Sequence, residues 1–406
     1  MLPLKVINLY GAPGMGKSAV AAGLFWLIKT RQASIEHITE YAKYLILSDR
    51  KWQLERDQLY VVAKQHHKME ILKGHYDFSV TDSPLALASF YATAYGIDLP
   101  NSFHQMTLDY VAQYQNIDFF LSRDLSKGGF FENTGRLHDR NTSMALEPQQ
   151  REWLKTKNIQ AHEMAITDTT PWDIVDAIEK QYPLNTKREG PARPVTSSVV
   201  DTGAPTHADD DVTVINLYGA PGMGKSAVAA GLFWLLKTRQ ASIEHVTEYA
   251  KYLILSNRKE QLNRQQFYVA AKQYHKMDIL RGHYSLCVTD SPLLLTSFYP
   301  DYYKVKAPPS FHQTAFDYAH SFKTINFFLS RNLRTAGQYE TTGRNEDMEQ
   351  SLAVETAQRQ WLKERNIQYV EIPINDVTPW IMVQHLEQHH QLRFPRLGPV
   401  MPDIAY

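Results

Sequence analysis

Two short stretches of this chain have residue types and spacing suited to binding phosphate. Residues 11–18 read GAPGMGKS, and the same letters recur at 219–226. In the pattern G-x-x-x-x-G-K-[ST], glycines let consecutive backbone N–H groups turn around phosphate oxygens, a lysine reaches the outer phosphates, and a hydroxyl ligates Mg²⁺. A turn that only joins a strand to a helix does not need the Lys-Ser pair. The sequence therefore predicts that both stretches bind ATP with Mg²⁺.

Every residue of each loop is a predicted nucleotide-binding residue. Lys17 and Lys225 are expected to contact the β- and γ-phosphates, and Ser18 and Ser226 are expected to ligate the metal. The full set is Gly11, Ala12, Pro13, Gly14, Met15, Gly16, Lys17, Ser18, Gly219, Ala220, Pro221, Gly222, Met223, Gly224, Lys225 and Ser226.

Two acidic residues in each copy follow apolar runs that read as strands. Asp82 ends FSVTD and Glu40 follows SIEHIT, with Asp290 and Glu248 as their counterparts. Phosphoryl transfer needs one acid to hold the metal and another to orient or deprotonate the acceptor hydroxyl. We assign Asp82 and Asp290 to the metal and Glu40 and Glu248 to the acceptor, with the reverse assignment also open. A structural role is the alternative, and for Glu40 it would be that of a first-turn acid favoured by the helix dipole.

Paired arginines follow the fourth apolar run of each copy. Arg123 and Arg136 recur as Arg331 and Arg344, although most residues between them differ. Cations on a hinged lid would neutralise charge on a transferred phosphoryl group. Glycines that suit such a hinge occur at Gly129, Gly135, Gly337 and Gly343. The alternative is a solvated loop with surface ion pairs.

A glutamine pair lies seven residues apart on one predicted helical face of each copy. Gln58 and Gln65 recur as Gln266 and Gln273. An amide both donates and accepts hydrogen bonds, which suits the edge of a nucleobase or a carboxamide. An exposed polar stripe is an equally open interpretation.

The elements that must position these residues alternate between strand and helix. In the first copy, strands are expected at 4–10, 34–38, 78–82, 117–122 and 160–166. Helices are expected at 16–30, 40–47, 58–73, 102–114, 147–158 and 170–180. This alternation predicts an α/β fold with a parallel sheet of about five strands covered by helices on both faces.

The whole unit is repeated at a constant spacing. INLYGAPGMGKSAVAAGLFWL begins at Ile7 and again, unchanged, at Ile215. We expect domain 1 at 1–182, a flexible linker at 183–211, domain 2 at 212–390 and a tail at 391–406, because the segment between the copies is rich in Pro, Thr, Ser and Asp.

Composition excludes several classes of protein. Lys plus Arg equals Asp plus Glu at 43 each, so no overall basic field indicates a nucleic-acid or membrane partner. The single cysteine, Cys287, excludes an intrachain disulfide and a thiolate metal cluster. No apolar run reaches the length of a membrane span, and the first residues do not read as a signal peptide. The expectation is a cytoplasmic protein, in the host cytoplasm if a phage encodes it.

These motifs in this order resemble those of a family of small P-loop kinase-like ATPases found largely in bacteriophages. The resemblance rests on GAPGMGKS, TEYAK, the glutamine-bearing helix, TDSPL, LSR and TGR. It extends to the nicotinamide-ribose kinase domain of the bacterial NAD-synthesis regulator. It implies a nucleoside-monophosphate-kinase-like core with the acids at acceptor and metal and the arginines in the lid. Members include kinases of 5-hydroxymethyluracil in DNA, and the tandem arrangement departs from their usual single unit.

Three functions compete. The leading one is an ATP-dependent kinase acting on a hydroxyl of a nucleoside-type acceptor, with the hydroxymethyl group of 5-hydroxymethyluracil in phage DNA as the specific expectation. The near-neutral charge argues against DNA. The second is a kinase of a free nucleoside, nucleotide or nicotinamide riboside, whose halves form an intramolecular pseudo-dimer. The third is a tandem ATPase that acts as a switch or motor, with Arg136 or Arg344 as an arginine finger.

Overall fold

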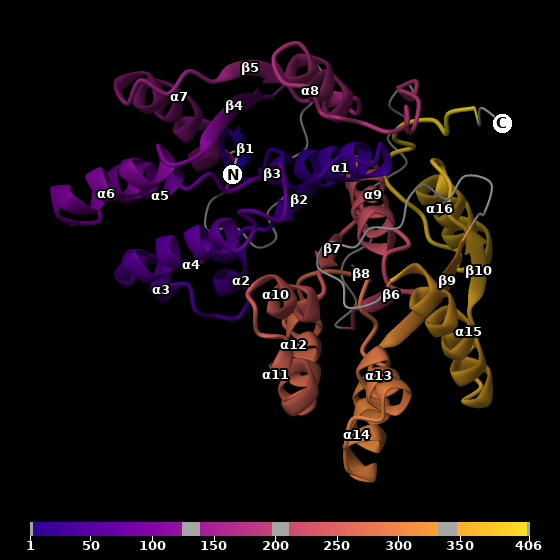
Figure 1. The fold of residues 1–406 in the computed structure, drawn as a ribbon. Helices are drawn as coiled ribbons and strands as arrows, with labels where there is room; N and C mark the ends of the chain where they lie inside the picture. The colour runs from indigo at the N-terminus through magenta and orange to yellow at the C-terminus, as the bar shows by residue number, and fades with distance from the viewer. Residues whose placement is uncertain (1–2, 124–138, 197–210, 332–346, 404–406) are drawn as a thin grey trace. The chain divides into compact units, whose positions relative to one another are not determined.

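The computed structural model describes residues 3–123, 139–196, 211–331 and 347–403 (Figure 1). The chain divides into two compact units, 1–189 and 190–406. Each unit is built on a five-stranded parallel sheet. The predicted α/β fold with two tandem P-loop domains is confirmed.

Unit 1 contains five strands and eight helices within its described residues. The strands are β1 (Lys5–Tyr10), β2 (Ile35–Ile38), β3 (Phe78–Thr81), β4 (Gln115–Ser122) and β5 (His162–Ala165). The helices are α1 (Lys17–Thr30), α2 (Tyr41–Leu47), α3 (Trp52–Arg56), α4 (Gln58–Glu70), α5 (Leu87–Ala94), α6 (Asn101–Val111), α7 (Arg140–Thr156) and α8 (Thr170–Glu179).

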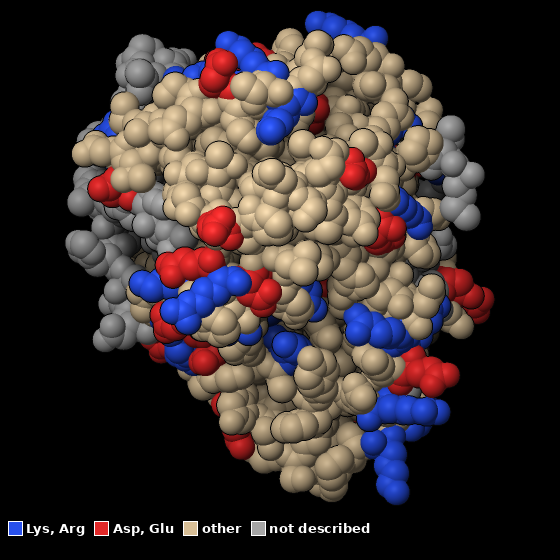
Figure 2. All heavy atoms as spheres, turned by 90° about the vertical axis from the view of Figure 1, so that its left-hand side faces the viewer, with Lys and Arg blue, Asp and Glu red and all other residues tan. Residues whose placement is uncertain are grey.

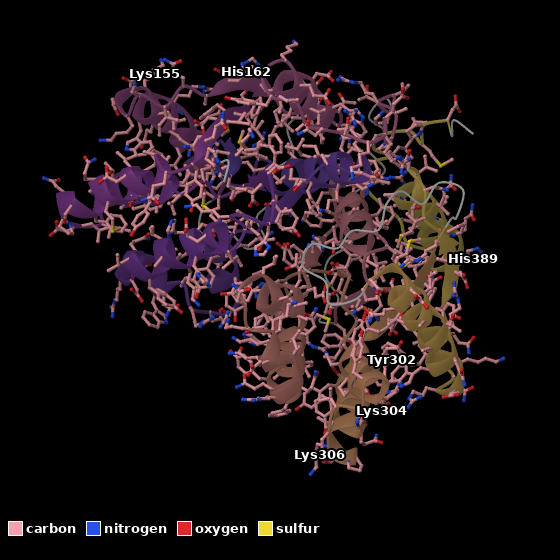
Figure 3. All side chains as sticks on the ribbon, in the orientation of Figure 1. Lys155, His162, Tyr302, Lys304, Lys306 and His389 are labelled. Atoms are coloured by element: carbon pink, nitrogen blue, oxygen red, sulfur yellow. The ribbon has the colours of Figure 1, made fainter. Side chains whose placement is uncertain are left out.

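Unit 2 repeats this order in the part of it that the structure describes. Its strands are β6 (Thr213–Tyr218), β7 (Ile243–Val246), β8 (Leu286–Thr289), β9 (Lys323–Ser330) and β10 (Val370–Pro373). Its helices are α9 (Lys225–Thr238), α10 (Tyr249–Leu255), α11 (Lys259–Arg264), α12 (Gln266–Asp278), α13 (Leu295–Tyr303), α14 (Pro309–His320), α15 (Met348–Glu364) and α16 (Thr378–His389). The connection between α13 and α14 carries Lys304 and Lys306 at the outer end of these helices (Figure 3).

The sheet order places the phosphate loop at the centre of each sheet. The strands run β2-β3-β1-β4-β5 in unit 1 and β7-β8-β6-β9-β10 in unit 2. The first strand of each unit therefore lies in the middle, and all but its first residue are buried, as expected for a parallel strand covered on both faces. The chain turns to opposite sides of this strand on its way to its two neighbours, which is where open α/β sheets bind ligands.

Helices cover both faces of each sheet. On one face, α1 packs against α8 through an edge-to-face contact between Trp26 and Trp172, with ring centroids 5.9 Å apart. On the other face, Tyr10 and Phe120 of the sheet pack with Phe90 of α5 and Leu154 of α7. Unit 2 repeats the tryptophan contact between Trp234 and Trp380 at 5.7 Å. In each unit, the phosphate loop therefore follows a strand whose two faces are both packed against helices.

The sequence located all five strands of unit 1 but not all of its helices. Helix α7 begins at Arg140 rather than near 147, because the Asp139 side chain caps it by accepting from the Thr142 N–H at 2.8 Å. Pro148 reads as a first-turn residue in the sequence, yet it lies inside this helix. The short helix α3 was not anticipated.

Residues on both sides of the division at 189/190 pack against their own units. Leu184 is buried, and the Lys187 N–H donates to the Arg31 carbonyl at 3.0 Å in unit 1. In unit 2, the Val400 N–H donates to Val195 O at 3.0 Å, and Trp380 Nε1 donates to Pro399 O at 3.0 Å. The first part of the expected linker and most of the expected tail therefore cover the surfaces of the units.

Asp118 in the sheet of unit 1 corresponds to Asn326 in unit 2, a neutral amide of the same shape. Burial raises the pKa of the Asp118 carboxyl to about 6, and its hydrogen bond from Asn8 Nδ2, at 2.8 Å, opposes that shift. In unit 2, Asn216 Nδ2 donates to Asn326 Oδ1 at 2.9 Å instead. Between pH 3.8 and about 6 the folded unit keeps a proton that the unfolded chain has released, so its stability falls as the pH rises.

Replacement of Asp118 by Asn should remove this loss of stability. We expect Asp118→Asn to stabilise unit 1 by about 2–3 kcal/mol at pH 7 and to change little at pH 4. Pulse proteolysis in urea, with fragments of each unit identified by mass spectrometry, measures the two units separately. Unit 2 is the internal control. A variant whose unit 1 keeps the pH dependence of the original chain would contradict the assignment.

Candidate nucleotide and acceptor site

The phosphate loop has a backbone shape that its first residue can adopt only as glycine. Gly11 and Gly219 both have φ near +131°. A Cβ at Gly11 would lie 2.6 Å from the Leu121 carbonyl oxygen, and one at Gly219 would lie 2.7 Å from that of Leu329. The loop is thus pressed against the end of the neighbouring strand, which leaves no room for any side chain.

The loop lysines are held inside the loops that precede them. Lys17 Nζ donates to Gly11 O at 2.7 Å and to Ala12 O at 2.9 Å. Lys225 Nζ donates to Gly219 O at 2.8 Å and to Ala220 O at 2.9 Å. Both side chains are buried. Each ammonium group is therefore positioned at the N-terminal end of a long buried helix, where phosphate oxygens are favoured.

A later helix anchors each loop from behind. Gln150 of α7 accepts from the Gly11 N–H at 2.8 Å, and Ser143 Oγ donates to Pro13 O at 2.5 Å. In unit 2, Gln358 and Ser351 of α15 make the same contacts at 2.7 Å each. All four side chains are at most 1% exposed. Sequence reasoning missed them, although a Ser and a Gln seven residues apart recur at the same spacing in both copies.

The first arginine of each pair lies against the phosphate loop. Arg123 Nη2 donates to Ser143 Oγ at 2.8 Å and to Pro13 O at 3.2 Å, and burial lowers the pKa of its guanidinium. Arg331 donates to Pro221 O at 3.4 Å and pairs with Glu355 at 3.2 Å. Both are therefore placed at the loop and α7 or α15. Arg136 and Arg344, with the four lid glycines, lie outside the described residues.

The strand-end aspartates are buried, and in unit 2 the aspartate contacts the loop serine. Asp82 and Asp290 are 5% and 3% exposed. Ser226 Oγ donates to Asp290 Oδ2, whereas Oδ1 of each aspartate has no hydrogen-bond partner in the part of the chain that the structure describes. A buried carboxylate oxygen without a donor is costly unless a cation satisfies it. The pair Ser226 and Asp290 therefore fits a hard divalent cation, and the buried Asp82 carboxylate of unit 1 has the same unsatisfied oxygen.

The described residues contain no cluster of three or more His, Cys, Asp or Glu side chains that would hold a metal alone. This matches Mg²⁺, which commonly takes one or two protein ligands and completes its shell with phosphate oxygens and water. The residues of the site therefore suit a metal that arrives with a nucleotide rather than one that resides in the protein.

Glu40 and Glu248 occupy the N-cap positions of α2 and α10. Neither side chain makes a capping hydrogen bond. The residue before each is held by a lysine that sequence reasoning missed: Lys68 Nζ donates to Thr39 O, and Lys276 Nζ donates to Thr247 O, both at 2.8 Å. Burial lowers the pKa of Lys276 to about 8, while the charges of Asp290 and Glu248 oppose that shift. This lysine therefore lies in the field of both acids.

A cavity of about 580 Å³ joins these groups in unit 1. Lys17, Glu40 and Asp82 all line it. Tyr91 of α5 and Tyr95, the residue after that helix, also line it, and their rings stack with centroids 5.6 Å apart. The loop, the start of α2 and the end of β3 are far apart in the sequence, so their meeting at this cavity is visible only in the folded structure.

The glutamine pair of unit 1 is buried rather than exposed, and in unit 2 Gln273 is buried and Gln266 half-buried, so the idea of an exposed polar stripe is wrong. Gln65 accepts from the Tyr41 N–H at 3.3 Å and donates to Ser83 O at 3.3 Å. Gln58 donates to the Leu54 carbonyl one turn earlier. Both also line the cavity. Gln65 therefore ties the start of α2 to the end of β3, which sets the spacing between Glu40 and Asp82.

Comparisons with known proteins agree with this fold. A family model described as an AAA domain matches residues 214–378, which lie in unit 2. No curated protein sequence is similar enough to count as a match.

None of the described helices is long and apolar enough to span a bilayer.

Solved structures with similarity to the chain include deoxyadenosine kinase from M. mycoides with bound dCTP and the NadR protein in complex with NR. The first is 13% identical with a TM-score of 0.29 and covers 43% of this chain and 98% of its own. The second is 10% identical with a TM-score of 0.33 and covers 97% of this chain and 99% of its own. The fold of each unit rests on its own strand order and phosphate loop.

The anchoring role of Gln358 predicts a change in nucleotide affinity. In a Lys17→Ala background, where unit 2 alone binds, Gln358→Leu should weaken magnesium–ATP binding about tenfold, because the buried Gly219 N–H loses its acceptor. Isothermal titration calorimetry measures the affinity. Gln360→Leu removes an exposed glutamine of the same helix and is the control. Equal affinities in the two variants would show that the contact does not position the loop.

Proposed function

We propose that each unit transfers the γ-phosphoryl group of ATP to a hydroxyl of a nucleoside-type acceptor. The observation that carries this proposal is the cavity of unit 1, in which a phosphate-loop lysine and two acids from separate strand ends line one space. A switch or motor ATPase needs the loop and the metal ligand. It does not need a second acid beside a walled cavity that can hold an organic acceptor.

The side chains take complementary roles in this proposal. The loop amides and Lys17 hold the triphosphate, and Ser18 and Asp82 hold Mg²⁺, which neutralises charge on the phosphates. Glu40 accepts the proton of the attacking hydroxyl. Gln65 and Lys68 position the start of α2 that carries Glu40. Arg136 and Arg344 would supply the lid cations.

Tyrosine rings and size support a nucleoside-type acceptor. Three tyrosines line the cavity, Tyr41, Tyr91 and Tyr95, and flat aromatic surfaces favour a planar base. Its volume of about 580 Å³ lies within the ordinary range for small-molecule sites.

Two forms of the acceptor follow from the resemblance described above. One is the hydroxymethyl group of 5-hydroxymethyluracil in DNA, and the other is a free nucleoside, nucleotide or nicotinamide riboside. A base in duplex DNA reaches such a cavity only after it leaves the helical stack. The face in Figure 2 carries Lys and Arg interspersed with Asp and Glu rather than a basic stripe. This distribution favours the free acceptor.

Unit 2 keeps the same groups in the same contacts. Lys225, Ser226, Glu248 and Asp290 occupy the counterpart positions, and Gln273 accepts from the Tyr249 N–H at 3.4 Å as Gln65 does from Tyr41. We therefore propose that both units are active.

The metal role of Asp290 predicts a selective loss. In the Lys17→Ala background, Asp290→Asn should weaken binding of magnesium–ATP at least about tenfold and leave binding of ATP in excess chelator unchanged, since only the metal loses a charged ligand. Calorimetric titrations with and without Mg²⁺ measure the difference. Asp317→Asn, at an exposed residue of α14, is the control. Equal losses with and without metal would contradict a metal-binding role.

Transfer of label from γ-³²P-ATP tests the reaction itself. The acceptor panel holds free nucleosides, nucleotides, nicotinamide riboside and DNA with 5-hydroxymethyluracil. Lys17→Ala and Lys225→Ala should each remove part of the activity, and the double variant should remove all of it. In the Lys225→Ala background, Glu40→Gln should lower transfer by about 10²–10⁴-fold with little change in ATP affinity. Release of phosphate that no acceptor stimulates would refute the kinase proposal and support a switch ATPase.

A further inference from the structure

Unit 2 contains a cavity that lies against one face of its sheet. Its volume is about 440 Å³. It is lined by residues of β6, by residues that lead into β9 and β10, and by Leu293 and Leu294, which follow β8. Val214, Asn216 and Tyr218 are alternate residues of β6, so the cavity lies against one face of the sheet. None of the phosphate-loop residues or site acids lines this cavity.

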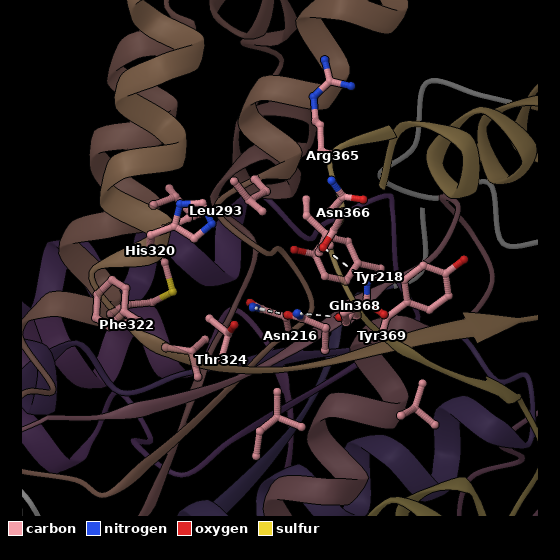
Figure 4. A pocket seen from close by; sticks show the side chains of 18 of the residues that line it. Asn216, Tyr218, Leu293, His320, Phe322, Thr324, Arg365, Asn366, Gln368 and Tyr369 are labelled. Carbon is pink, nitrogen blue, oxygen red and sulfur yellow. Dashed lines mark hydrogen bonds between the residues drawn. The ribbon is translucent and has the colours of Figure 1, made fainter. Parts of the chain in front are cut away.

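The floor of the cavity is a row of amides on the sheet. Asn216 Nδ2 donates to Asn326 Oδ1 at 2.9 Å, and Asn326 Nδ2 donates to Gln368 O at 3.0 Å (Figure 4). Asn216 is only 6% exposed and still lines the cavity. Figure 4 also shows Thr324 beside this row on the sheet.

The same place in unit 1 has a different hydrogen-bond pattern. There, Asn8 Nδ2 donates to both Asn116 Oδ1, at 2.9 Å, and Asp118 Oδ1, at 2.8 Å. Asn116 in turn donates to the carbonyls of Val111 and Tyr114. Thr324 is the counterpart of Asn116, and its shorter side chain has one hydroxyl and no amide. Among the described residues, the Asn216 amide therefore donates to one side chain, Asn326, whereas the Asn8 amide donates to two.

The walls of this cavity also differ from unit 1 at its rim. His320 and Tyr369 replace residues that are alanine in unit 1, Ala112 and Ala161. Tyr218, Phe322 and Tyr369 bring aromatic rings to the lining. Figure 4 shows His320 and Phe322 on one side of the sheet residues and Tyr369 on the other. Such walls favour a planar ligand.

The charges around the cavity favour an uncharged ligand. No carboxylate or lysine is among the described residues that line it. Arg365 pairs with Asp301 at 3.3 Å and lies over the Trp361 ring at 4.2 Å, so its guanidinium is already engaged. Burial and the neighbouring His389 lower the pKa of the His390 imidazole, which disfavours its charged form. A phosphate group would find no dedicated partner.

We propose that this cavity of unit 2 binds an uncharged nucleoside whose base presents a lactam edge, a carbonyl next to an N–H. The Asn216 amide offers one donor and one acceptor, which is the complement of that edge. This proposal uses neither the phosphate loop nor the site acids and does not depend on the proposed function.

Methyl NMR of the full chain tests the proposal with uridine as the probe. Met277 lines the cavity, and its counterpart in unit 1, Met69, is the internal control. With [methyl-¹³C]methionine and saturating ADP, uridine should shift the Met277 signal in a saturable way and leave that of Met69 in place. 3-Methyluridine, which lacks the N–H of the lactam, should bind about tenfold more weakly.

Thr324→Asn gives unit 2 the residue of unit 1 and should close the site. The expected result is loss of the uridine-dependent Met277 shift with an otherwise unchanged methionine spectrum. Tyr369→Ala, which also introduces the residue of unit 1, should weaken uridine binding. It is the alternative test if the Thr324→Asn variant does not fold. A Met277 signal that uridine does not move, or moves no more than that of Met69, would overturn the proposal. Equal affinity for 3-methyluridine would overturn lactam recognition.

Discussion

The structure depends on the close approach of the phosphate loop to the end of the next strand. Gly11 and Gly219 lie so near the carbonyls of Leu121 and Leu329 that no side chain fits. A backbone this tightly placed exposes its amides in one direction only, and the buried Gln150 and Gln358 fix the first of them from behind. The helices that carry these glutamines are distant in sequence from the loops. The geometry of phosphate binding is therefore a property of the whole sheet and its covering helix, not of the loop alone.

In each unit a second set of contacts fixes the distance between the two acids that follow neighbouring strands. Gln65 bonds both the start of α2 and the turn after β3, and Lys68 holds the carbonyl that precedes Glu40. In unit 2, Gln273 accepts from the Tyr249 N–H and donates to Thr289 Oγ1 at the end of β8, and Lys276 donates to Thr247 O. Glu40 and Asp82 belong to different loops, so without these ties each would move with its own loop. Helix α4 thus acts as the element that positions the two acids.

The sequence predicted the strands and the phosphate loop because their signals are local. A buried parallel strand is a short apolar run, and the loop pattern is contiguous. The supporting contacts were not predictable in the same way. Ser143 and Gln150 lie on a helix whose first half is polar and which contains Pro148, so its true start at Arg140 is set by a cap and by burial against the loop. The burial of Gln58 and Gln65 also depends on packing that no periodicity reveals.

A comparison of the two units shows which parts of the fold are restrained by the geometry of phosphate binding. At the carboxyl edge, the loop and its anchors are the same in both units, since a change in any of them moves the amides that face the phosphates. At the opposite edge, no such restraint acts. Asn116 and Asp118 of unit 1 become Thr324 and Asn326 in unit 2, and alanines give way to His320 and Tyr369. Because none of these four residues belongs to the phosphate loop or its anchors, unit 2 has a different cavity lining while its phosphate loop stays intact.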